Sequence, residues 1–152
     1  MNDTNLEGTI RDSFESFQSL RFADFSNNKF SGPLPGSIFD IAGIEILYFS
    51  ENALTGSIPA NYGNASNLRD LYVNDNQLVG MVPPITPGQL LNLTEFRLEN
   101  NSITGTMPAS ICALRGEDET NDLYALVADC GGMVPLIQCD CCNGCIDNSK
   151  ST

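Results

Sequence analysis

Four asparagines recur at an almost constant spacing, and this repetition constrains the fold more than any other feature of the chain. The successive intervals are 24, 24 and 25 residues, between Asn28, Asn52, Asn76 and Asn101. Each asparagine lies in the same frame of apolar side chains, followed by Gly and then by Pro. A fixed period of this length indicates a solenoid, in which each unit buries its apolar residues only by stacking on its neighbours.

The four units share one pattern, L-x-x-L-x-L-x-x-N-x-L-x-G-x-Ψ-P, where Ψ is apolar. They begin at Leu20, Ile44, Leu68 and Leu93. The alternating apolar positions predict a short strand, the Gly suits a tight bend, and the Pro starts the return segment with a fixed φ. The asparagine amide can bond the backbone of its own coil and of the next, so its loss would leave buried polar groups unpaired.

The array begins partway through a unit and ends among cysteines. Leu6, Gly8 and Ile10 lie 24 residues before the equivalent positions of the first full unit. After the last full unit, Leu123 and Leu126 fit one more strand. The expected organisation is a solenoid over residues 1–135, with a partial first repeat at 1–19, repeats from 20, 44, 68 and 93 and a terminal strand at about 123–130, and then a Cys-rich C-terminal cap and tail over 136–152.

The G-x-Ψ-P ending resembles the plant-type leucine-rich repeat family, whose members include receptor-kinase ectodomains and polygalacturonase-inhibiting proteins. The resemblance covers residues 1–135. The tail ADCGGMVPLIQCDCCNGC is similar to the C-terminal cap of leucine-rich repeat proteins of diatoms and related algae. The resemblance implies an α/β repeat fold, a right-handed solenoid with a concave parallel β-sheet, and a binding function.

Charge and motif content exclude several classes of function. The net charge is −12 with seven Lys and Arg, which argues against nucleic acid and anionic lipid as partners. No apolar run approaches about 18 residues, so no membrane span is expected in this chain. There is no His and no nucleophile or phosphate-binding motif. Acids such as Asp70 and Glu95 more often form a solvated face than a catalytic pair, so we expect a protein that is not an enzyme and binds no cofactor or metal.

The cysteines are concentrated near the C-terminus. An even number at one end of a repeat array predicts disulfides that close the open core, although six cysteines allow fifteen pairings. The alternative is a thiolate metal site in the C-x-C-C-x-x-C segment, since Zn²⁺ accepts four Cys ligands. The candidates are Cys112, Cys130, Cys139, Cys141, Cys142 and Cys145.

The location of the protein follows from weak but concordant features. The N-terminal residues lack the charged and apolar regions of a signal peptide. The disulfide pattern and four N-x-S/T sequons nevertheless favour a secreted or cell-surface protein whose signal peptide is absent from this chain. An intracellular protein is the alternative. The glycosylation candidates are Asn2, Asn64, Asn92 and Asn100.

The concave face is where the repeat register places exposed side chains. Tyr48 and Tyr72 should stand side by side on neighbouring strands, with Phe22 and Ile46 close by. An aromatic pair within an acidic rim is typical of a recognition surface, although two tyrosines can also simply pack on each other. The ligand-binding candidates are Phe22, Asp24, Ile46, Tyr48, Asp70, Tyr72, Asn74, Glu95, Arg97 and Glu99.

These features favour an extracellular recognition module that binds a protein or peptide, of basic character, on the concave face. By resemblance, the ligand could instead be a cell-wall polysaccharide or a wall-degrading enzyme. A structural or assembly protein is the alternative from a different class. In that case the uncapped N-terminal repeat, which exposes Leu6 and Ile10, would pair with another chain or with a missing preceding segment.

Overall fold

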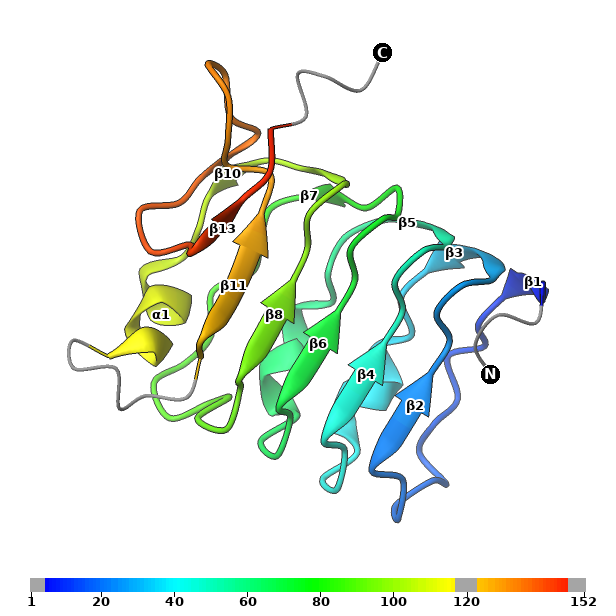
Figure 1. Ribbon diagram of the computed structural model, residues 1–152. Coiled ribbons are helices and arrows are strands. Elements are labelled where there is room, and N and C mark those ends of the chain that lie inside the picture. The colour runs from blue at the N-terminus through cyan, green and yellow to red at the C-terminus, as the bar shows by residue number, and fades with distance from the viewer. Residues whose placement is uncertain (1–4, 117–122, 148–152) are drawn as a thin grey trace.

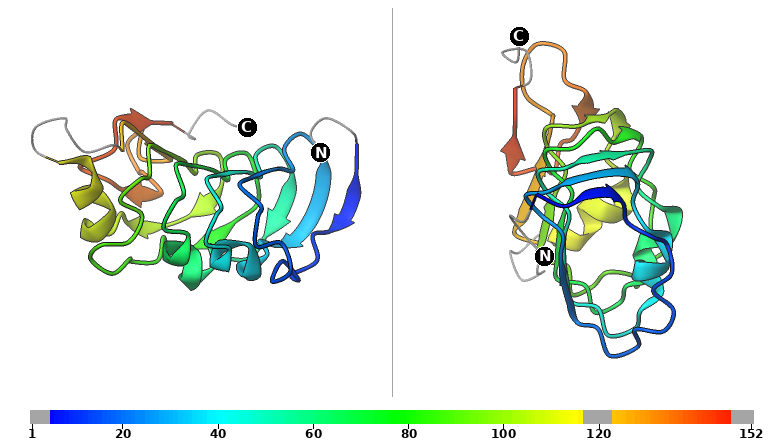
Figure 2. Two further views of the ribbon diagram at one scale, coloured as in Figure 1. Left: turned by 90° about the horizontal axis from the view of Figure 1, so that it is seen from below. Right: turned by 90° about the vertical axis from the view of Figure 1, so that its right-hand side faces the viewer.

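The computed structural model describes residues 5–116 and 123–147. The chain winds as a series of stacked coils, each made of a strand, a turn and a return segment (Figure 1). Viewed from the N-terminal side, the coils lie one behind another (Figure 2). The expected leucine-rich repeat solenoid is therefore confirmed.

One parallel sheet runs along the whole solenoid. Among the described residues it has six strands in the order β13-β11-β8-β6-β4-β2. Neighbouring strands pair in exact repeat register, so Leu47 lies opposite Leu71 and Leu71 opposite Phe96. The strands are β2 (Phe22–Asp24), β4 (Ile46–Tyr48), β6 (Asp70–Tyr72), β8 (Glu95–Arg97), β11 (Ala125–Ala128) and β13 (Gly144–Cys145).

A second layer of short parallel pairs follows the turn of each coil. The groups are β1-β3-β5, β7-β9 and β10-β12. Their bounds are β1 (Glu7–Thr9), β3 (Lys29–Pro33), β5 (Ala53–Thr55), β7 (Val79–Gly80), β9 (Ser102–Ile103), β10 (Gly105–Thr106) and β12 (Ile137–Gln138).

Short helical turns lie behind the six-stranded sheet, on the return segments (Figure 1). Each of the first three begins directly after the Pro of the repeat, whose fixed φ prepares the turn. These elements are η1 (Gly36–Asp40), η2 (Ala60–Asn64), α1 (Ala109–Cys112) and η3 (Ala113–Arg115). No helix of the described residues has the length and apolar character needed to cross a bilayer.

The core fills the space between the sheet and the helical turns. The middle residue of each inner strand points inward, and Leu47, Leu71 and Phe96 are fully buried. The buried tyrosine Tyr62 comes from η2, and its hydroxyl donates to the carbonyl of Pro83 at 2.8 Å. Each coil therefore contributes one layer to a continuous core, and no coil encloses its own.

The repeated asparagines connect the coils at the turn. The Asn52 Oδ1 accepts from the Phe30 N–H at 2.9 Å, and its Nδ2 donates to the carbonyl of Phe25 at 3.0 Å and to that of Phe49 at 3.1 Å. The sequence predicted that each asparagine bonds the backbone of its own coil and of the next coil. The structure shows instead its own coil and the preceding coil, because the Phe30 N–H and the Phe25 carbonyl both point toward the coil that follows them. Asn76 repeats the arrangement, as does Asn101, and Asn28 bonds Leu6 in the same way.

The C-terminal end replaces this pattern with a buried carboxylate. In an inner coil the Asn52 N–H donates to the backbone carbonyl of Asp75 at 3.1 Å. In the last full coil the N–H groups of Asn100 and Asn101 donate instead to the two carboxylate oxygens of Asp129, at 2.8 and 3.1 Å. Asp129 is 1% exposed. One side chain therefore supplies both acceptors at the end of the ladder.

Disulfides hold the segment that closes this end. The pairs are Cys112–Cys141, Cys130–Cys145 and Cys139–Cys142. They use all six cysteines, so no thiol is left for the thiolate metal site considered as the alternative. Both β12 and β13 lie beyond residue 135. The segment predicted as a cap thus adds a strand to each layer, and the domain boundary itself stays a prediction.

The ladder predicts a large cost for losing one asparagine. Replacing Asn76 by Ala leaves the Leu54 N–H without its acceptor and removes the donor to the carbonyl of Phe49. The expected loss in the free energy of unfolding is about 1–3 kcal/mol, measured by urea denaturation. The adjacent and exposed Gln77→Ala variant is the control and should unfold at nearly the wild-type midpoint. Equal stability of the two variants would contradict the structural role of the ladder.

Candidate functional site

The concave face is formed by the outward side chains of the six-stranded sheet. In the inner strands the first and third residues point outward on either side of the buried middle residue. The strand register aligns them in two columns. The column of first strand residues is Phe22, Ile46, Asp70, Glu95 and Ala125. The column of third strand residues is Asp24, Tyr48, Tyr72, Arg97 and Val127.

An aromatic row crosses four of these strands, and we use the term for Phe22, Tyr48, Tyr72 and Arg97. The rings of Tyr48 and Tyr72 are stacked with centroids 4.5 Å apart. Phe22 meets Tyr48 edge-on at 5.9 Å. At the other end, the guanidinium carbon of Arg97 lies 5.3 Å from the Tyr72 ring centroid, within range of a cation–π interaction. The structure thus brings these four predicted residues together as one continuous surface.

The tyrosine hydroxyls are tied to carboxylates on the following strand. Tyr48 donates to Asp70 Oδ2 at 3.2 Å, and Tyr72 donates to Glu95 Oε2. Burial and the neighbouring carboxylates raise the pKa of both tyrosines, since each stabilises the neutral hydroxyl. Each ring is therefore held in place at its edge by a diagonal hydrogen bond to the next coil.

Glu95 is the centre of this network. It accepts from the hydroxyls of Tyr72 and Tyr124 and, at 3.4 Å, from Arg97 Nε. Burial alone raises the pKa of Glu95, but the hydrogen bonds from Tyr124 and Tyr72 and the charge of Arg97 outweigh it and hold the net pKa below its usual value. Glu95 is thus ionised, and side chains of the protein itself donate the hydrogen bonds that its carboxylate accepts.

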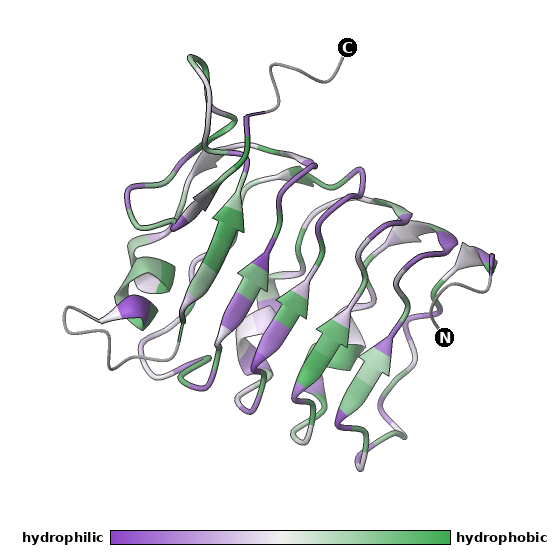
Figure 3. Ribbon diagram, in the orientation of Figure 1, coloured by the Kyte–Doolittle hydropathy of each residue, from purple (hydrophilic) through white to green (hydrophobic). Residues whose placement is uncertain are grey.

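Polarity changes along the face (Figure 3). Strands β2 and β4 carry one charged residue between them, Asp24, whereas β6 carries Asp70 and β8 carries Glu95 and Arg97 beside their apolar middle residues. Phe22 is 52% exposed. Arg97 has both of its carboxylate contacts on its own strand or just beyond it, at Glu95 and Glu99. The face is therefore apolar and aromatic toward the N-terminal side, and hydrogen-bonded and charged toward the C-terminal side.

Glu99 differs from the exposed position that the register predicted. It is only 7% exposed, and the equivalent residues Ser26 and Ser50 of other coils are also buried. The residue that follows each of these has a positive φ, for example 55° at Glu51 and 56° at Asn100. The chain turns there, so Glu99 lies at the start of the turn and beneath the rim of the face. Asn74 lies at the same level and is half-buried.

Tyr124 is the site residue that the sequence reasoning missed. It is 61% exposed and reaches Glu95 from the start of the last strand. Its position corresponds to Thr94 one coil earlier, and Thr94 likewise bonds an acid, Asp70, through its hydroxyl at 2.8 Å. Extending that column by one more strand would have found Tyr124.

The predicted sequons fall on exposed edges of the coils. Asn2 lies outside the described residues. The other three are exposed, and each side-chain amide donates a hydrogen bond to the preceding coil: Asn64 to Asp40, Asn92 to Ser66 and Asn100 to Asp75. Glycosylation at these positions stays a prediction.

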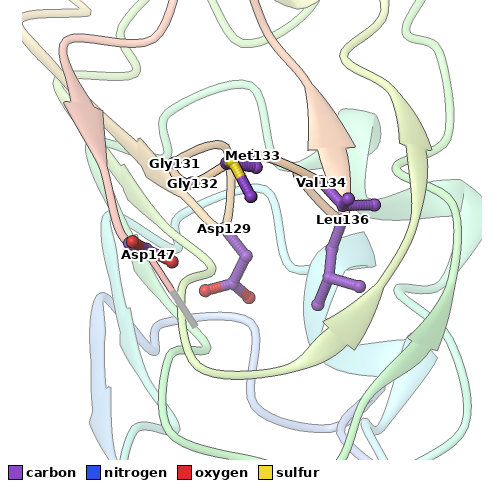
Figure 4. Close-up of a pocket in the computed structure, with 7 residues that line it drawn as sticks. All are labelled: Asp129, Gly131, Gly132, Met133, Val134, Leu136 and Asp147. Atoms are coloured by element: carbon purple, nitrogen blue, oxygen red, sulfur yellow. The ribbon is translucent and has the colours of Figure 1, made fainter. Parts of the chain in front are cut away.

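A separate hollow lies beside the loop after β11 (Figure 4). Paired residues of the last two coils are 30 apart in the main sheet, as in Glu95 with Ala125, but 32 apart in the second layer, as in Gly105 with Ile137. The two extra residues extend the loop, where Met133 is 99% exposed and Val134 89%. The hollow has a volume of about 560 Å³ and is lined by Asp129, Gly131, Gly132, Met133, Val134, Leu136 and Asp147.

Comparisons with known proteins agree with the leucine-rich repeat fold. Residues 19–41 and 92–114 match the family model described as Leucine Rich Repeat. No curated protein sequence matches the chain. Among solved structures, the ectodomain of the plant membrane receptor kinase GASSHO1/SCHENGEN3 from Arabidopsis thaliana, in complex with CASPARIAN STRIP INTEGRITY FACTOR 2, is 35% identical with a TM-score of 0.66. That match covers 70% of this chain and 13% of the receptor.

Two further structures are similar. PEPR1-AtPEP1 is 33% identical with a TM-score of 0.67, over 71% of this chain and 15% of that one. The BIR3–SERK2 complex from Arabidopsis thaliana is 28% identical with a TM-score of 0.70, over 91% of this chain and 71% of that one. The chain thus spans less than a fifth of the length of the first two of these solved chains.

The Glu95 network predicts a specific response to removing its donors. In the Tyr72→Phe/Tyr124→Phe double variant, the Glu95 carboxylate loses two hydrogen bonds, so its pKa should rise. Because the wild-type pKa is lowered, the stability that Glu95 contributes is present at neutral pH and is lost as the pH falls through the folded-state pKa. Carboxyl NMR titration measures the change. Tyr48→Phe is the control, since its hydroxyl bonds Asp70 and not Glu95; an unchanged Glu95 pKa in the double variant would contradict the network.

Proposed function

We propose that this chain, a leucine-rich repeat protein of the plant type, is a non-catalytic recognition module that binds a protein or peptide along its concave face. The observation that carries the proposal is the aromatic row. Its stacked rings are held at their edges by carboxylates of the next coil, so the surface needs little ordering when a ligand arrives. Aromatic and Arg side chains on a rigid support are the residues that most often dominate binding energy.

The chemistry of the face favours a ligand that is both apolar and basic. Phe22 and Tyr48 offer ring surface on the N-terminal side. The carboxylates of Asp24 and Asp70 border them, and the whole chain carries a net charge of −12. Such a field attracts cationic partners and accelerates their encounter, in a manner that salt weakens. The ligand class is thus a peptide segment that presents Lys or Arg next to apolar side chains.

Two of the similar receptors are described together with bound partners, a named factor in one case and AtPEP1 in the other. This supports a peptide or protein ligand for the present chain. The three disulfides support a secreted or cell-surface location, because such bonds persist in oxidising compartments. We therefore place the proposed binding event outside the cell.

Selection of peptides from a random library on the purified chain tests the proposal. The enriched sequences should contain Lys or Arg with apolar neighbours. Replacing Tyr48 and Tyr72 together by Ala should weaken their binding at least about 30-fold, as expected when a hot spot is removed. Affinity measured by calorimetry should also fall between low and physiological salt.

The matched control is Met81→Ala, which truncates an exposed apolar side chain that follows β7, away from the concave face. It should bind the selected peptides with wild-type affinity. Unchanged affinity in the tyrosine double variant would rule out the concave face. Salt-independent binding of neutral oligosaccharides in place of peptides would favour a wall polysaccharide as the ligand.

The second candidate is an assembly function through the N-terminal side of the solenoid. Strand β2 is the last strand of the main sheet among the described residues, so none of them pairs with its outer edge. Beside it, Phe14, Phe17, Leu20 and Phe22 line a hollow of about 350 Å³. Phe17 is 54% exposed. An open strand edge next to exposed aromatic rings suits pairing with another strand.

Sedimentation over a wide range of concentration tests this candidate. Assembly predicts that the mass rises with concentration and that Phe17→Ser shifts the chain back toward a monomer. The Tyr48→Ala/Tyr72→Ala variant should assemble like the wild type. A monomer at every concentration would exclude self-assembly while leaving peptide binding by the concave face unaffected.

A further inference from the structure

Two buried acceptor atoms next to the aromatic row have no donor. Among the described residues, Glu99 Oε2 and Asn74 Oδ1 are both shielded from solvent and accept no hydrogen bond. They occupy equivalent positions on neighbouring coils, where the Asp75 N–H donates to the Glu99 backbone carbonyl at 3.0 Å. A buried polar atom without a partner costs about 1–3 kcal/mol, so two such acceptors at paired positions of neighbouring coils call for a donor.

Rotating the amide of Asn74 does not solve the problem. Its Nδ2 already donates to Asp75 Oδ2 at 2.6 Å, and Asp75 Oδ1 accepts from Asn100 Nδ2 at 2.8 Å. Exchanging the nitrogen and oxygen of Asn74 would place its oxygen against the Asp75 carboxylate. The Asn74 oxygen is therefore directed away from Asp75, and its donor has to come from another group.

The charged groups around Glu99 come from three neighbouring coils. Arg97, on its own strand, lies with Nη1 4.0 Å from Glu99 Oε1. Asp75 follows β6 and Asp129 follows β11, and the Asp129 oxygens are occupied by backbone N–H groups. Burial raises the pKa of the Glu99 carboxyl, its own backbone N–H and Arg97 oppose the rise, and Asp75 and Asp129 add to it. The net pKa is raised.

We infer that Glu99 is a protonated acid in the folded chain, that it shares its proton with the Asn74 amide oxygen, and that loss of this proton draws Arg97 away from the aromatic row. Arg97 lies between two carboxylates, with Nε 3.4 Å from Glu95 Oε2 and Nη1 4.0 Å from Glu99 Oε1. With Glu99 neutral, Arg97 stays beside Glu95 and over Tyr72. When the proton leaves to solvent, the buried anion attracts Arg97 strongly, because little water screens it.

Glu99 thus acts as a positioning residue for Arg97, and proton occupancy sets the shape of one end of the concave face. The consequence for ligand binding rests on the proposed function. With Glu99 protonated, the row ends in a guanidinium over Tyr72. With Glu99 ionised, the Tyr72 ring is uncovered and an additional negative charge lies beneath it, which favours a cationic ligand.

The test is a pH titration of the intact, disulfide-bonded chain by NMR, without any ligand. The Glu99 carboxyl carbon should titrate at a higher pH in the folded chain than in the urea-unfolded chain, and the Arg97 Nε–H resonance should shift with the same midpoint as Glu99. In Glu99→Gln the Arg97 shift should disappear. The control Glu51→Gln, an exposed acid one coil away from Asp75, should keep the wild-type midpoint.

Thermal unfolding supplies a second readout. Since the folded state binds the proton more tightly, Glu99 stabilises the fold at acid pH, and this contribution is lost as the pH rises through the folded-state pKa. Glu99→Gln, which keeps a donor for Asn74, should therefore melt at a higher temperature than wild type at neutral pH and match it in acid. A lower melting temperature at neutral pH, with Glu99 titrating alike in the folded and the unfolded chain, would overturn the inference and make Glu99 an ionised partner of Arg97.

Because neither measurement needs a ligand, they separate this inference from the proposed function. A switch that titrates as expected in a chain that selects no peptide would leave the inference intact and remove the proposed function. Peptide selection by a chain whose Glu99 titrates normally would overturn the inference and leave the proposed function intact.

Discussion

Every feature of this protein depends on the fact that no coil can bury its own apolar residues. A strand of three residues has one inward side chain, and its core partner is the equivalent residue of the next coil, as in Leu47 with Leu71. The same geometry leaves the turn's backbone groups pointing at the neighbouring coil. The asparagine ladder meets that need with one side chain per coil, which accepts from one backbone N–H and donates to carbonyls of two coils. Stability therefore comes from repetition, and each interface is as important as each unit.

The concave face follows from this stacking. Strict parallel register brings side chains of neighbouring coils close together, so contacts form across coils and along diagonals. The stacking of Tyr48 on Tyr72 is a contact within one column. The bond from Tyr72 to Glu95 is diagonal, and so is the bond from Tyr48 to Asp70. The diagonals orient the rings and leave their surfaces available, which is how a rigid scaffold can present a recognition surface.

The repeated hydrogen bonds of the ladder are replaced by other interactions at the C-terminal end of the solenoid. At the C-terminal end the Asn100 and Asn101 N–H groups donate to the buried carboxylate of Asp129, which takes the place of the backbone carbonyls that accept in the inner coils. Disulfides then hold the final strands, and the bond between Cys130 and Cys145 joins the segment just after β11 to β13. The Asp129 carboxylate and the disulfides do not follow the repeat, because each replaces a periodic interaction at one place only. The buried Glu99 lies next to this transition, where the charges of Asp75, Arg97 and Asp129 converge.

The solenoid, the asparagine ladder and the columns of the concave face are all predictable from the sequence, because each depends on a period that can be read directly from the spacing of Asn52, Asn76 and their equivalents. The sequence also indicated that Tyr48 and Tyr72 lie side by side. Features that do not repeat along the chain became known only from the three-dimensional structure. The pairing of the cysteines depends on how the last segment folds back, and the burial of Glu99 depends on the turn that begins after it. The bond from the Tyr124 hydroxyl to Glu95 depends on the side-chain conformation of Tyr124, which the column position that it shares with Thr94 does not fix.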